Sequence, residues 1–404
     1  MQNIYSKAST SRIISAIICF MGLCSCCKVQ HEQGSLQPEW SFAIPTYESE
    51  EIFYDGLPNL PKNKDIILAH TTVYDGGFQN EDNRLCAIDI KRGNVVWYFP
   101  SDLATRHFCR FDAKGYAYND KFVFQYMKNG NGDSQYDTHT TVCLDARNGD
   151  ILWELDGVFY LDSINKDVVG DGKDCFFVQG ENKVCKADLS DNSMETIYDT
   201  DTLHISGIRL CDDYLVVSCF APSKEEFKQH NYCVVLDKET ADAITRPIYI
   251  GECDLCCHGL VEDGILYANQ NRYITAIDIR NNTKLWERQD DWAYILVDMY
   301  VHKNVLLKCA VNATVGYDKK TGEILYDYQD YGSWYTTIHK GYAYLLNRKD
   351  ILVVFDVLTG KMLDHVVCPV VGDGFFGSYP VVYDEKLYII GGNSLYRYPT
   401  YPWK

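Results

Sequence analysis

The stretch LCAIDIKRGNVVWYF at residues 85–99 combines a short apolar strand, a turn at Asp89 and Gly93, and a second strand that carries Trp97. The same pattern, Asp-x-x-x-Gly-x-x-x-Trp, returns as VCLDARNGDILWEL at 142–155. Further copies follow at 274–287 (Asn282 replaces Gly), 315–326 (Tyr326 replaces Trp) and 352–363. A strand, turn and aromatic strand repeated in this way predict a circular array of similar sheets.

The spacing of the motif aspartates gives the size of one unit. They are 38 to 56 residues apart, at Asp89, Asp145, Asp188, Asp237, Asp278, Asp318 and Asp356. The copies at Asp188 and Asp237 lack both the Gly and the aromatic, so spacing is the main reason to include them. A period near 40 residues with strand-like content is typical of four-stranded propeller blades.

The residue types within a copy explain its local structure. Apolar and β-branched residues before the aspartate, as in 274–277, suit a pleated strand. The aspartate can bond to its own backbone, and Gly four positions later accepts a positive φ. An aromatic eight residues after the aspartate, as at Trp97, Trp153 and Trp286, is large enough to bury roughly 200 Å² against a neighbouring blade.

Other segments complete each unit. Strands entered by a tight turn are expected upstream of the motif at 263–269, 303–310, 340–346 and 385–392. No segment has convincing helical periodicity.

The two ends of the chain are expected to share a blade. After Asp356 the sequence offers three more strands and no fourth, whereas 39–44 (EWSFAI) reads as a single outer strand with Trp40 in the position of Trp97. We therefore predict an all-β, eight-bladed β-propeller over 39–404, closed by this N-terminal strand so that no open sheet edge is left. Seven blades remain the alternative if one weak copy is not a blade.

The pattern Ala-x-Asp-x-x-x-Gly-x-x-x-Trp at Ala87, Asp89, Gly93 and Trp97 resembles the repeat of the pyrroloquinoline-quinone-like β-propeller family, over roughly 39–403. That family contains quinone-dependent dehydrogenases. It also contains non-catalytic envelope lipoproteins, such as the propeller subunit of the outer-membrane barrel assembly machinery. The enzymes are usually longer, with loops that bring Glu, Asn and Asp to a Ca²⁺ and an Asp as base. That ligand set matches no motif here, so no catalytic residue and no cofactor are expected.

Residues 1–25 read as a targeting segment, with Lys7 and Arg12 before an apolar stretch too short to span a bilayer. The sequence Leu-Cys-Ser-Cys at 23–26 resembles a bacterial lipobox, which makes Cys26 the expected lipidated residue. Cys24 fits less well, and an ordinary secretory signal is the alternative. Residues 26–38 would then be a polar tether, and we expect a lipid-anchored protein of the bacterial envelope, facing the periplasm from the outer membrane.

The formal net charge of −18 argues against a nucleic-acid partner and permits a cationic one. Of the 17 cysteines, Cys86, Cys143, Cys185 and Cys233 lie in strands just before a motif aspartate. An unpaired cysteine there behaves as a small buried apolar residue, and we expect most of the cysteines to be unpaired.

Two clusters could bind a metal or cofactor, but each has a simpler interpretation. Cys253-Asp-Leu-Cys256-Cys257-His258 lacks the spacing of a c-type haem site and the further ligands of a zinc site, and we read it as a Cys-rich inner strand of blade 5. Asp167-Val-Val-Gly-Asp171-Gly172-Lys-Asp174 resembles a calcium loop but has Val169 at a ligand position. A Gly-rich hairpin turn is the favoured interpretation of that stretch.

Loop length suggests which face binds a partner. The turns between first and second strands and the Asp–Gly turns are short, whereas long loops join second to third strands at 76–84, 128–140 and 221–231. Rigid scaffolds often carry their binding residues on such loops, and aromatics often anchor interfaces. The expected partner-binding residues are Phe78, Tyr136, Phe227, Trp292 and Trp334, although the aromatics in the blade-to-blade connections could instead fill space between blades.

The sequence therefore favours a non-catalytic, monomeric envelope lipoprotein that binds a protein partner. An immunity or inhibitor lipoprotein that neutralises a toxin is one alternative. A quinone-dependent dehydrogenase or another enzyme that binds a small ligand is the other.

Overall fold

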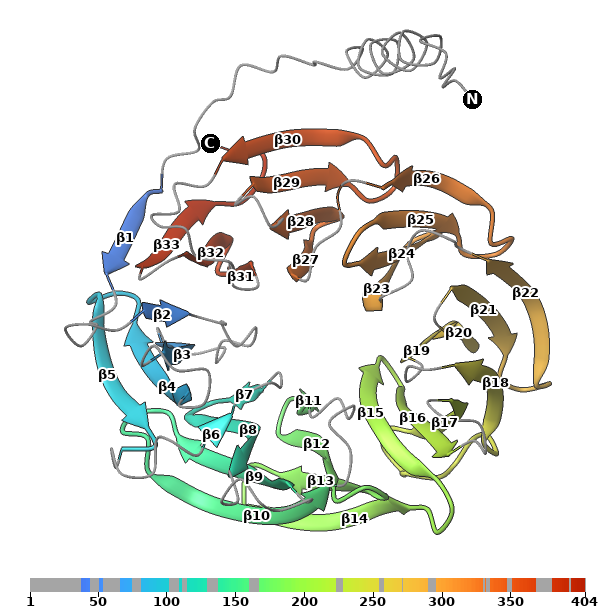
Figure 1. The fold of residues 1–404 in the computed structure, drawn as a ribbon, viewed down its shortest axis with the longest axis horizontal. Coiled ribbons are helices and arrows are strands. Elements are labelled where there is room, and N and C mark those ends of the chain that lie inside the picture. Colours follow the sequence, from blue (N-terminus) through green and yellow to red (C-terminus); the bar gives the residue numbers. More distant parts are fainter. Residues whose placement is uncertain are drawn as a thin grey trace, which may run out of the picture. The chain divides into compact units, whose positions relative to one another are not determined.

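The computed structural model describes residues 38–43, 51–53, 66–74, 81–101, 109–110, 115–128, 137–159, 167–222, 228–253, 258–270, 272–289, 296–329, 331, 335–346, 351–367, 380–391 and 394–403. These residues form eight sheets and no α-helix, and all lie within the unit Leu36–Lys404. The sheets are the blades of an eight-bladed β-propeller (Figure 1), so the eight-blade prediction is confirmed. Within the described residues, no helix is long and apolar enough to cross a membrane.

In blades 1 to 7 the strands follow the order of the sequence from the ring centre outwards, whereas the outermost strand of blade 8 comes from the N-terminal end of the chain. Blade 1 comprises β2 (Glu51–Phe53), β3 (Ile66–Tyr74), β4 (Glu81–Asp89) and β5 (Asn94–Phe99). Blade 2 comprises β6 (Cys109–Arg110), β7 (Tyr116–Tyr118), β8 (Lys121–Lys128), β9 (Asp137–Asp145) and β10 (Ile151–Phe159). Blade 3 comprises β11 (Val169–Asp171), β12 (Asp174–Gln179), β13 (Lys183–Asp188) and β14 (Ser193–Asp199). Blade 4 comprises β15 (His204–Cys211), β16 (Tyr214–Pro222), β17 (Gln229–Asp237) and β18 (Ile248–Cys253).

The second half of the ring has shorter strands. Blade 5 comprises β19 (His258–Glu262), β20 (Ile265–Gln270), β21 (Tyr273–Asp278) and β22 (Thr283–Gln289). Blade 6 comprises β23 (Leu296–His302), β24 (Val305–Ala310), β25 (Thr314–Asp318) and β26 (Ile324–Tyr328). Blade 7 comprises β27 (Tyr335–His339), β28 (Tyr342–Leu346), β29 (Ile351–Asp356) and β30 (Met362–Val367). Blade 8 comprises β31 (Val381–Tyr383), β32 (Lys386–Gly391), β33 (Ser394–Pro399) and β1 (Trp40–Ala43).

The N-terminal strand closes the ring as predicted. β1 pairs antiparallel with β33, from Trp40 opposite Arg397 to Ala43 opposite Ser394. Lys386 Nζ also lies 2.7 Å from Glu39 Oε1, which joins the two ends of the chain by an ion pair. The edge that β33 would otherwise expose is therefore covered by a strand from the other end of the sequence.

Every motif aspartate organises the turn that follows it. The Asp318 carboxylate accepts hydrogen bonds from the backbone N–H groups of Lys320 and Thr321, both at 2.9 Å. The Gly322 N–H donates to the Asp318 carbonyl at 2.8 Å, which closes the turn. These backbone donors, with Thr321 the strongest, hold the pKa of Asp318 below its usual value. The predicted role of the aspartate as a turn residue is confirmed, and the weak copies at Asp188 and Asp237 form true blades.

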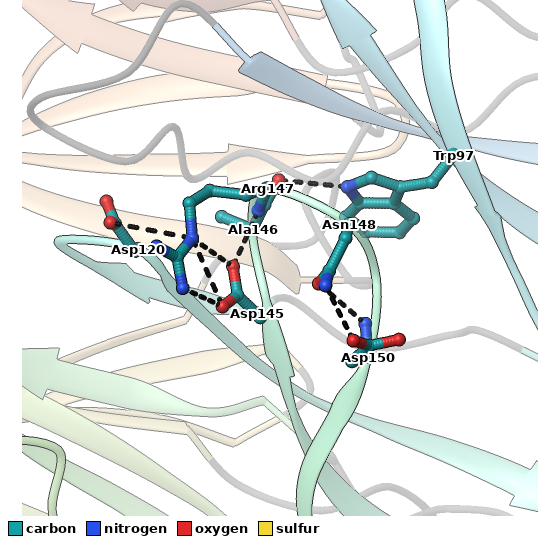
Figure 2. A network of polar contacts seen from close by, with 7 residues as sticks. All are labelled: Trp97, Asp120, Asp145, Ala146, Arg147, Asn148 and Asp150. Carbon is teal, nitrogen blue, oxygen red and sulfur yellow. Dashed lines mark hydrogen bonds and ion pairs between the residues drawn. The ribbon is translucent and has the colours of Figure 1, made fainter.

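The aromatic of one blade bonds to the aspartate turn of the next. The Trp97 indole N–H donates to the Ala146 carbonyl, one residue after Asp145, at 2.9 Å (Figure 2). Trp286 Nε1 donates in the same way to the Lys319 carbonyl at 3.1 Å, and Tyr326 OH donates to the Val357 carbonyl at 2.6 Å. We call this interaction the docking contact. It joins blade 1 to 2, blade 5 to 6 and blade 6 to 7.

The glycine of the motif lies against the docked ring. A Cβ atom added to Gly149 would approach Trp97 to 2.9 Å, one on Gly322 would approach Trp286 to 2.6 Å, and one on Gly360 would approach Tyr326 to 2.4 Å. Real Cβ atoms do not make contacts this short. The glycine is therefore required twice over, by its positive φ and by the aromatic ring of the preceding blade.

A β-bulge aims each docking aromatic at its target. One residue on the outer strand has no opposite partner just before Trp97, Trp153, Trp286 and Tyr326. The bulged residues are Val96, Leu152, Leu285 and Leu325, all of them exposed. A bulge bends the strand and changes the direction of the side chain that follows, which here turns the ring towards the next blade.

The copies without the motif glycine follow blades that lack a docking contact. The turns of blades 3, 4 and 5 have Asn192, Ala241 and Asn282 in the glycine position, each with positive φ. Thr196 and Thr245 stand where blades 3 and 4 would carry the aromatic. In blade 3 the Leu189 carbonyl accepts from Lys121 Nζ at 2.5 Å, and the buried Trp153 Nε1 has no hydrogen-bond partner among the described residues. Asn282 therefore follows blade 4, which has Thr245 in place of a docking aromatic.

The cysteines of the described strands are part of the core. Cys86, Cys143, Cys185 and Cys233 are buried and form no disulfide bond, which confirms the prediction for these four. Cys175, Cys211, Cys219 and Cys309 are also free and buried. Burial raises the pKa of Cys143 to about 12, so its thiol stays protonated at neutral pH.

Replacing Gly322 by Ala should destabilise the protein more than replacing Gly264 by Ala. Both glycines have a similar positive φ (+70° and +73°), but a Cβ on Gly264 meets nothing within 4 Å. At either site we expect the free energy of unfolding to fall by about 1 kcal/mol, because alanine is strained at this positive φ. At Gly322 it should fall by roughly 1–3 kcal/mol more, because the added Cβ clashes with Trp286. Urea unfolding measures both, and equal losses would contradict the docking contact.

Candidate functional site

The residues that the sequence singled out as sites lie outside the described part of the chain. This applies to the lipidation residue Cys26 and to the expected partner-binding residues Phe78, Tyr136, Phe227, Trp292 and Trp334. Their roles stay predictions.

The segments predicted as long loops are shorter than expected because the strands extend into them. β3 and β4 remain paired up to Tyr74 and Glu81, and β8 and β9 up to Lys128 and Thr138. β16 and β17 remain paired up to Pro222 and Gln229. The paired strands of blades 1, 2 and 4 are therefore longer than the five- and six-residue strands β20, β24 and β28 of blades 5, 6 and 7.

A cavity of about 360 Å³ lies against the innermost strands of blades 2 to 6. Its walls are partly aliphatic, from residues such as Val169, Ile208 and Leu210. Its polar lining consists of Tyr116, Asp167, Arg209, Ser218, His258 and Asp298. A concave site of this size with a few convergent polar groups is the usual form of a small-ligand or side-chain pocket.

The strand register brings four of the lining positions to one level. The innermost strands of blades 3 to 6 end in pairs that close a tight turn: Asp171–Asp174, Cys211–Tyr214, Glu262–Ile265 and His302–Val305. Counting four residues back from each first member gives Asp167, Gly207, His258 and Asp298. Because each strand residue advances by about 3.3 Å, these four lie at a similar distance from the turns. The absence of a side chain at Gly207 widens the cavity at that level.

Arg209 links two blades across the one between them. Its Nη1 lies 2.7 Å from Asp298 Oδ1, and its Nη2 donates to the Met299 carbonyl, so β15 of blade 4 is joined to β23 of blade 6. The guanidinium also lies 5.7 Å from the centre of the Tyr300 ring, a cation–π distance. Burial opposes the charge on Arg209, but the Asp298 carboxylate outweighs it, and the pKa of Arg209 is raised.

Asp298 is held by donors on several sides. Besides Arg209, it accepts hydrogen bonds from the Tyr300 hydroxyl and the Met299 N–H, both at 2.8 Å. The Tyr300 hydroxyl also lies 3.2 Å from the Thr336 carbonyl of blade 7. Burial and the Asp298 charge raise the pKa of Tyr300 well above its usual value, so the phenol remains a neutral donor.

A second cavity of about 260 Å³ lies beyond the ion pair. It shares Arg209 and Leu210 with the first and continues to Asp212 and Glu262, at the ends of the innermost strands. The first cavity instead includes Asp167 and His258, near where the chain enters blades 3 and 5. The first cavity therefore lies towards the blade-to-blade connections, and the second towards the tight turns.

The described residues of the two clusters considered as metal or cofactor sites have ordinary structural positions. Asp171 and Asp174 flank the β11–β12 hairpin turn, which confirms that interpretation, and pair with Lys238 and Lys186 respectively. Among the described residues, no group of three or more His, Cys, Asp or Glu side chains could hold a metal ion. The prediction that this cluster forms an inner strand of blade 5 is wrong for Cys253, which ends the outer strand β18 of blade 4, where a bulge at Ile250 bends the strand. The prediction is confirmed for His258, which begins the innermost strand β19 of blade 5. Residues 254–257 lie outside the described residues.

Sequence patterns identify two of the six polar residues of the cavity, and for other reasons. Asp167 belongs to the possible calcium loop and His258 to the cysteine-rich cluster. Arg209 and Asp298 belong to no motif. Counting four residues back from each tight turn would have found Asp167, His258 and Asp298, but Arg209 reaches the site from another level of its strand.

Several solved structures share this fold at low sequence identity. BamB from Moraxella catarrhalis matches with a TM-score of 0.52 and 13% identity, over 91% of this chain and 98% of that one. The computationally designed Ika8 protein matches with a TM-score of 0.59 and 11% identity, over 91% and 100%. Quinohemoprotein alcohol dehydrogenase from Comamonas testosteroni matches with a TM-score of 0.53 and 9% identity, over 90% of this chain and 76% of that one. These likenesses establish the propeller fold and nothing finer.

No model of a known protein family matches the sequence. A search of curated proteins also finds no match. The resemblance to the pyrroloquinoline-quinone-like repeat therefore rests on the motif and on the shared fold.

Replacing Arg209 by Met should cost about 3 kcal/mol of stability, because it leaves the partly buried Asp298 carboxylate without its cation. Arg92→Met is the matched control: Arg92 lies 3.7 Å from Asp89, but its side chain is 82% exposed. The control should cost less than about 1 kcal/mol. Urea unfolding of both variants measures the difference, and similar losses would show that Arg209 does not join blades 4 and 6.

Proposed function

We propose that this chain is a non-catalytic propeller scaffold that binds a protein partner in a bacterial cell envelope, where a lipid on Cys26 anchors it. The observation that carries the proposal is that the polar groups of the repeat and of the ring centre bond to other parts of the propeller. The motif aspartates bond to their own turns, the docking aromatics bond to the next blade, and Arg209 joins blade 4 to blade 6. These internal hydrogen bonds and ion pairs make the ring rigid. A rigid ring is a suitable scaffold for loops that bind a partner.

Two further observations support the proposal. The likeness to BamB spans nearly the whole of both chains, which supports a complete propeller scaffold. The strongly acidic composition favours a partner that presents positive charge, because complementary fields speed association.

The proposal predicts that tagged protein captures a specific envelope protein after crosslinking in cells. Replacing Phe78, Tyr136, Phe227, Trp292 and Trp334 together by Ala should abolish that capture, because aromatic anchors carry much of the energy of an interface. The control variant replaces Tyr249 and Tyr273 by Ala, which are exposed on outer parts of blades 4 and 5. Capture that survives the loop variant, or fails with the control, would contradict the assigned face.

The anchor is tested in the same cells. Cys26→Ser should abolish fatty-acid labelling and release the protein from membranes, whereas Cys24→Ser should change neither. Unchanged labelling of Cys26→Ser would exclude the proposed lipidation site.

A quinone-dependent enzyme is the second candidate, favoured by the likeness to a quinohemoprotein dehydrogenase and by the central cavity. Titration with pyrroloquinoline quinone and Ca²⁺ distinguishes the two functions. A scaffold gives no saturable spectral change, whereas binding accompanied by dye reduction would replace the proposal with the enzyme.

A further inference from the structure

The inner and outer turns of the blades lie on one side of the ring, which we call the turn side. The Ala146 N–H in the outer turn of blade 2 donates to the Asp120 carbonyl in the inner turn at 2.7 Å. In blade 6 the Lys319 N–H donates to the Asn304 carbonyl at 2.9 Å in the same way. The outer strands of blades 1 to 7 start at the outer turns and run away from them, so the blade-to-blade connections lie on the opposite side.

The described chain also enters the ring from the turn side. Lys386 opens β32 directly after the inner turn of blade 8, where it pairs with Tyr383. The ion pair between Lys386 and Glu39 therefore places the residue before β1 at the level of this turn. A lipid on Cys26 would hold the start of β1 within roughly 40 Å of the membrane, because an extended chain spans about 3.3–3.6 Å per residue.

The outer turns of four blades present a basic side chain to solvent. These residues, which we call the cationic tips, are Arg92, Arg147, Arg280 and Lys320, in blades 1, 2, 5 and 6. In blade 1 the Arg92 side chain is 82% exposed and the Asp89 side chain 18%. In blade 2 the corresponding values are 65% for Arg147 and 11% for Asp145. Both aspartates bond to the backbone of their own turns, so these turns present mainly positive charge at their tips.

An exposed aliphatic side chain accompanies each cationic tip. It is the bulged residue of the following outer strand, and the four are Val96, Leu152, Leu285 and Leu325, between 40% and 48% exposed. Each follows its tip by four or five residues, so it lies near the turn side. Single exposed aliphatic residues are normal at a protein surface, but here the same pair recurs in four blades at one level. Basic groups beside exposed apolar ones are the combination by which amphipathic surfaces lie in the headgroup region of a bilayer.

The four pairs are arranged so that they can meet a plane together. Blades 1 and 5 lie on opposite sides of the ring, as do blades 2 and 6 (Figure 1). The acidic outer turns are those of blades 3 and 4, with Asp191 and Glu239, and the inner turn of blade 4 adds Asp212 and Asp213. A contact through the outer rim of blades 1, 2, 5 and 6 avoids these carboxylates.

We propose that the turn side lies against the surface of a phospholipid bilayer. The cationic tips contact phosphate groups, and the bulged aliphatic residues enter the headgroup region. This inference rests on the proposed function, because it needs the lipid on Cys26. The opposite side, where the partner is expected to bind, then points away from the membrane.

The test places the photo-crosslinking amino acid p-benzoylphenylalanine at Leu285 of the full-length protein in cells. Its matched control is the same probe at Gln289, which is exposed at the other end of β22 and about 13 Å farther from the turn side. A second pair, Leu152 and Asp156 in β10, samples another part of the ring. After irradiation, mass spectrometry should find severalfold more phospholipid adducts at Leu285 and Leu152 than at their controls.

Equal adducts at the two ends of a strand, more adducts at the controls, or protein adducts in place of lipid adducts at Leu285 and Leu152 would overturn the proposal. The probe at Leu325, which is also exposed, replaces either position if that variant fails to fold. Fatty-acid labelling of Cys26 in the same cells separates this proposal from the anchor. The absence of lipid adducts from a labelled protein overturns only the contact with the bilayer, whereas loss of both signals also overturns the anchor.

Discussion

The contact between the aromatic of one blade and the glycine turn of the next is the interaction on which the rest of the structure depends. It couples three features that are separate in the sequence: the bulge before the aromatic, the carbonyl after the aspartate, and the glycine. A four-stranded sheet cannot bury both faces alone, so each blade needs its neighbours. At the outer rim, Trp286 joins blade 5 to blade 6. Its ring covers Gly322, and its indole N–H donates a hydrogen bond to the Lys319 carbonyl.

The docking contact is distributed unevenly, and the centre of the ring compensates. In the part of the chain that the structure describes, the docking contact is absent from the junctions of blade 3 with 4 and of blade 4 with 5, and the junction of blade 2 with 3 has a bond from Lys121 instead. Blade 4 is instead joined from the inside, where Arg209 reaches Asp298, and from the turns, where Lys238 pairs with Asp171 of blade 3 at 2.6 Å. The first cavity lies against this same blade, and two of its lining residues, Arg209 and Asp298, form this link.

The sequence was sufficient for the architecture because local chemistry specifies it. Asp318 and Gly322 define a turn, alternating residues define strands, and the period of the aspartates defines the ring. The sequence could not show that Gly322 must lack a side chain because Trp286 of the preceding blade packs against it. That contact forms only when the two blades lie side by side. The same holds for Arg209 and Asp298, which are 89 residues apart in the chain and meet only because the ring closes around its axis.

Hydrogen exchange of the aspartate turns, resolved by mass spectrometry, tests most directly whether docking holds the ring together. The turns that follow Asp145, Asp237, Asp318 and Asp356 share the same internal hydrogen bond from the residue four positions after the aspartate. They differ in whether an aromatic ring from the preceding blade covers them. The account predicts slower exchange for the docked turns at 145–149, 318–322 and 356–360 than for the undocked turn at 237–241. Equal rates, or faster exchange in the docked turns, would contradict it.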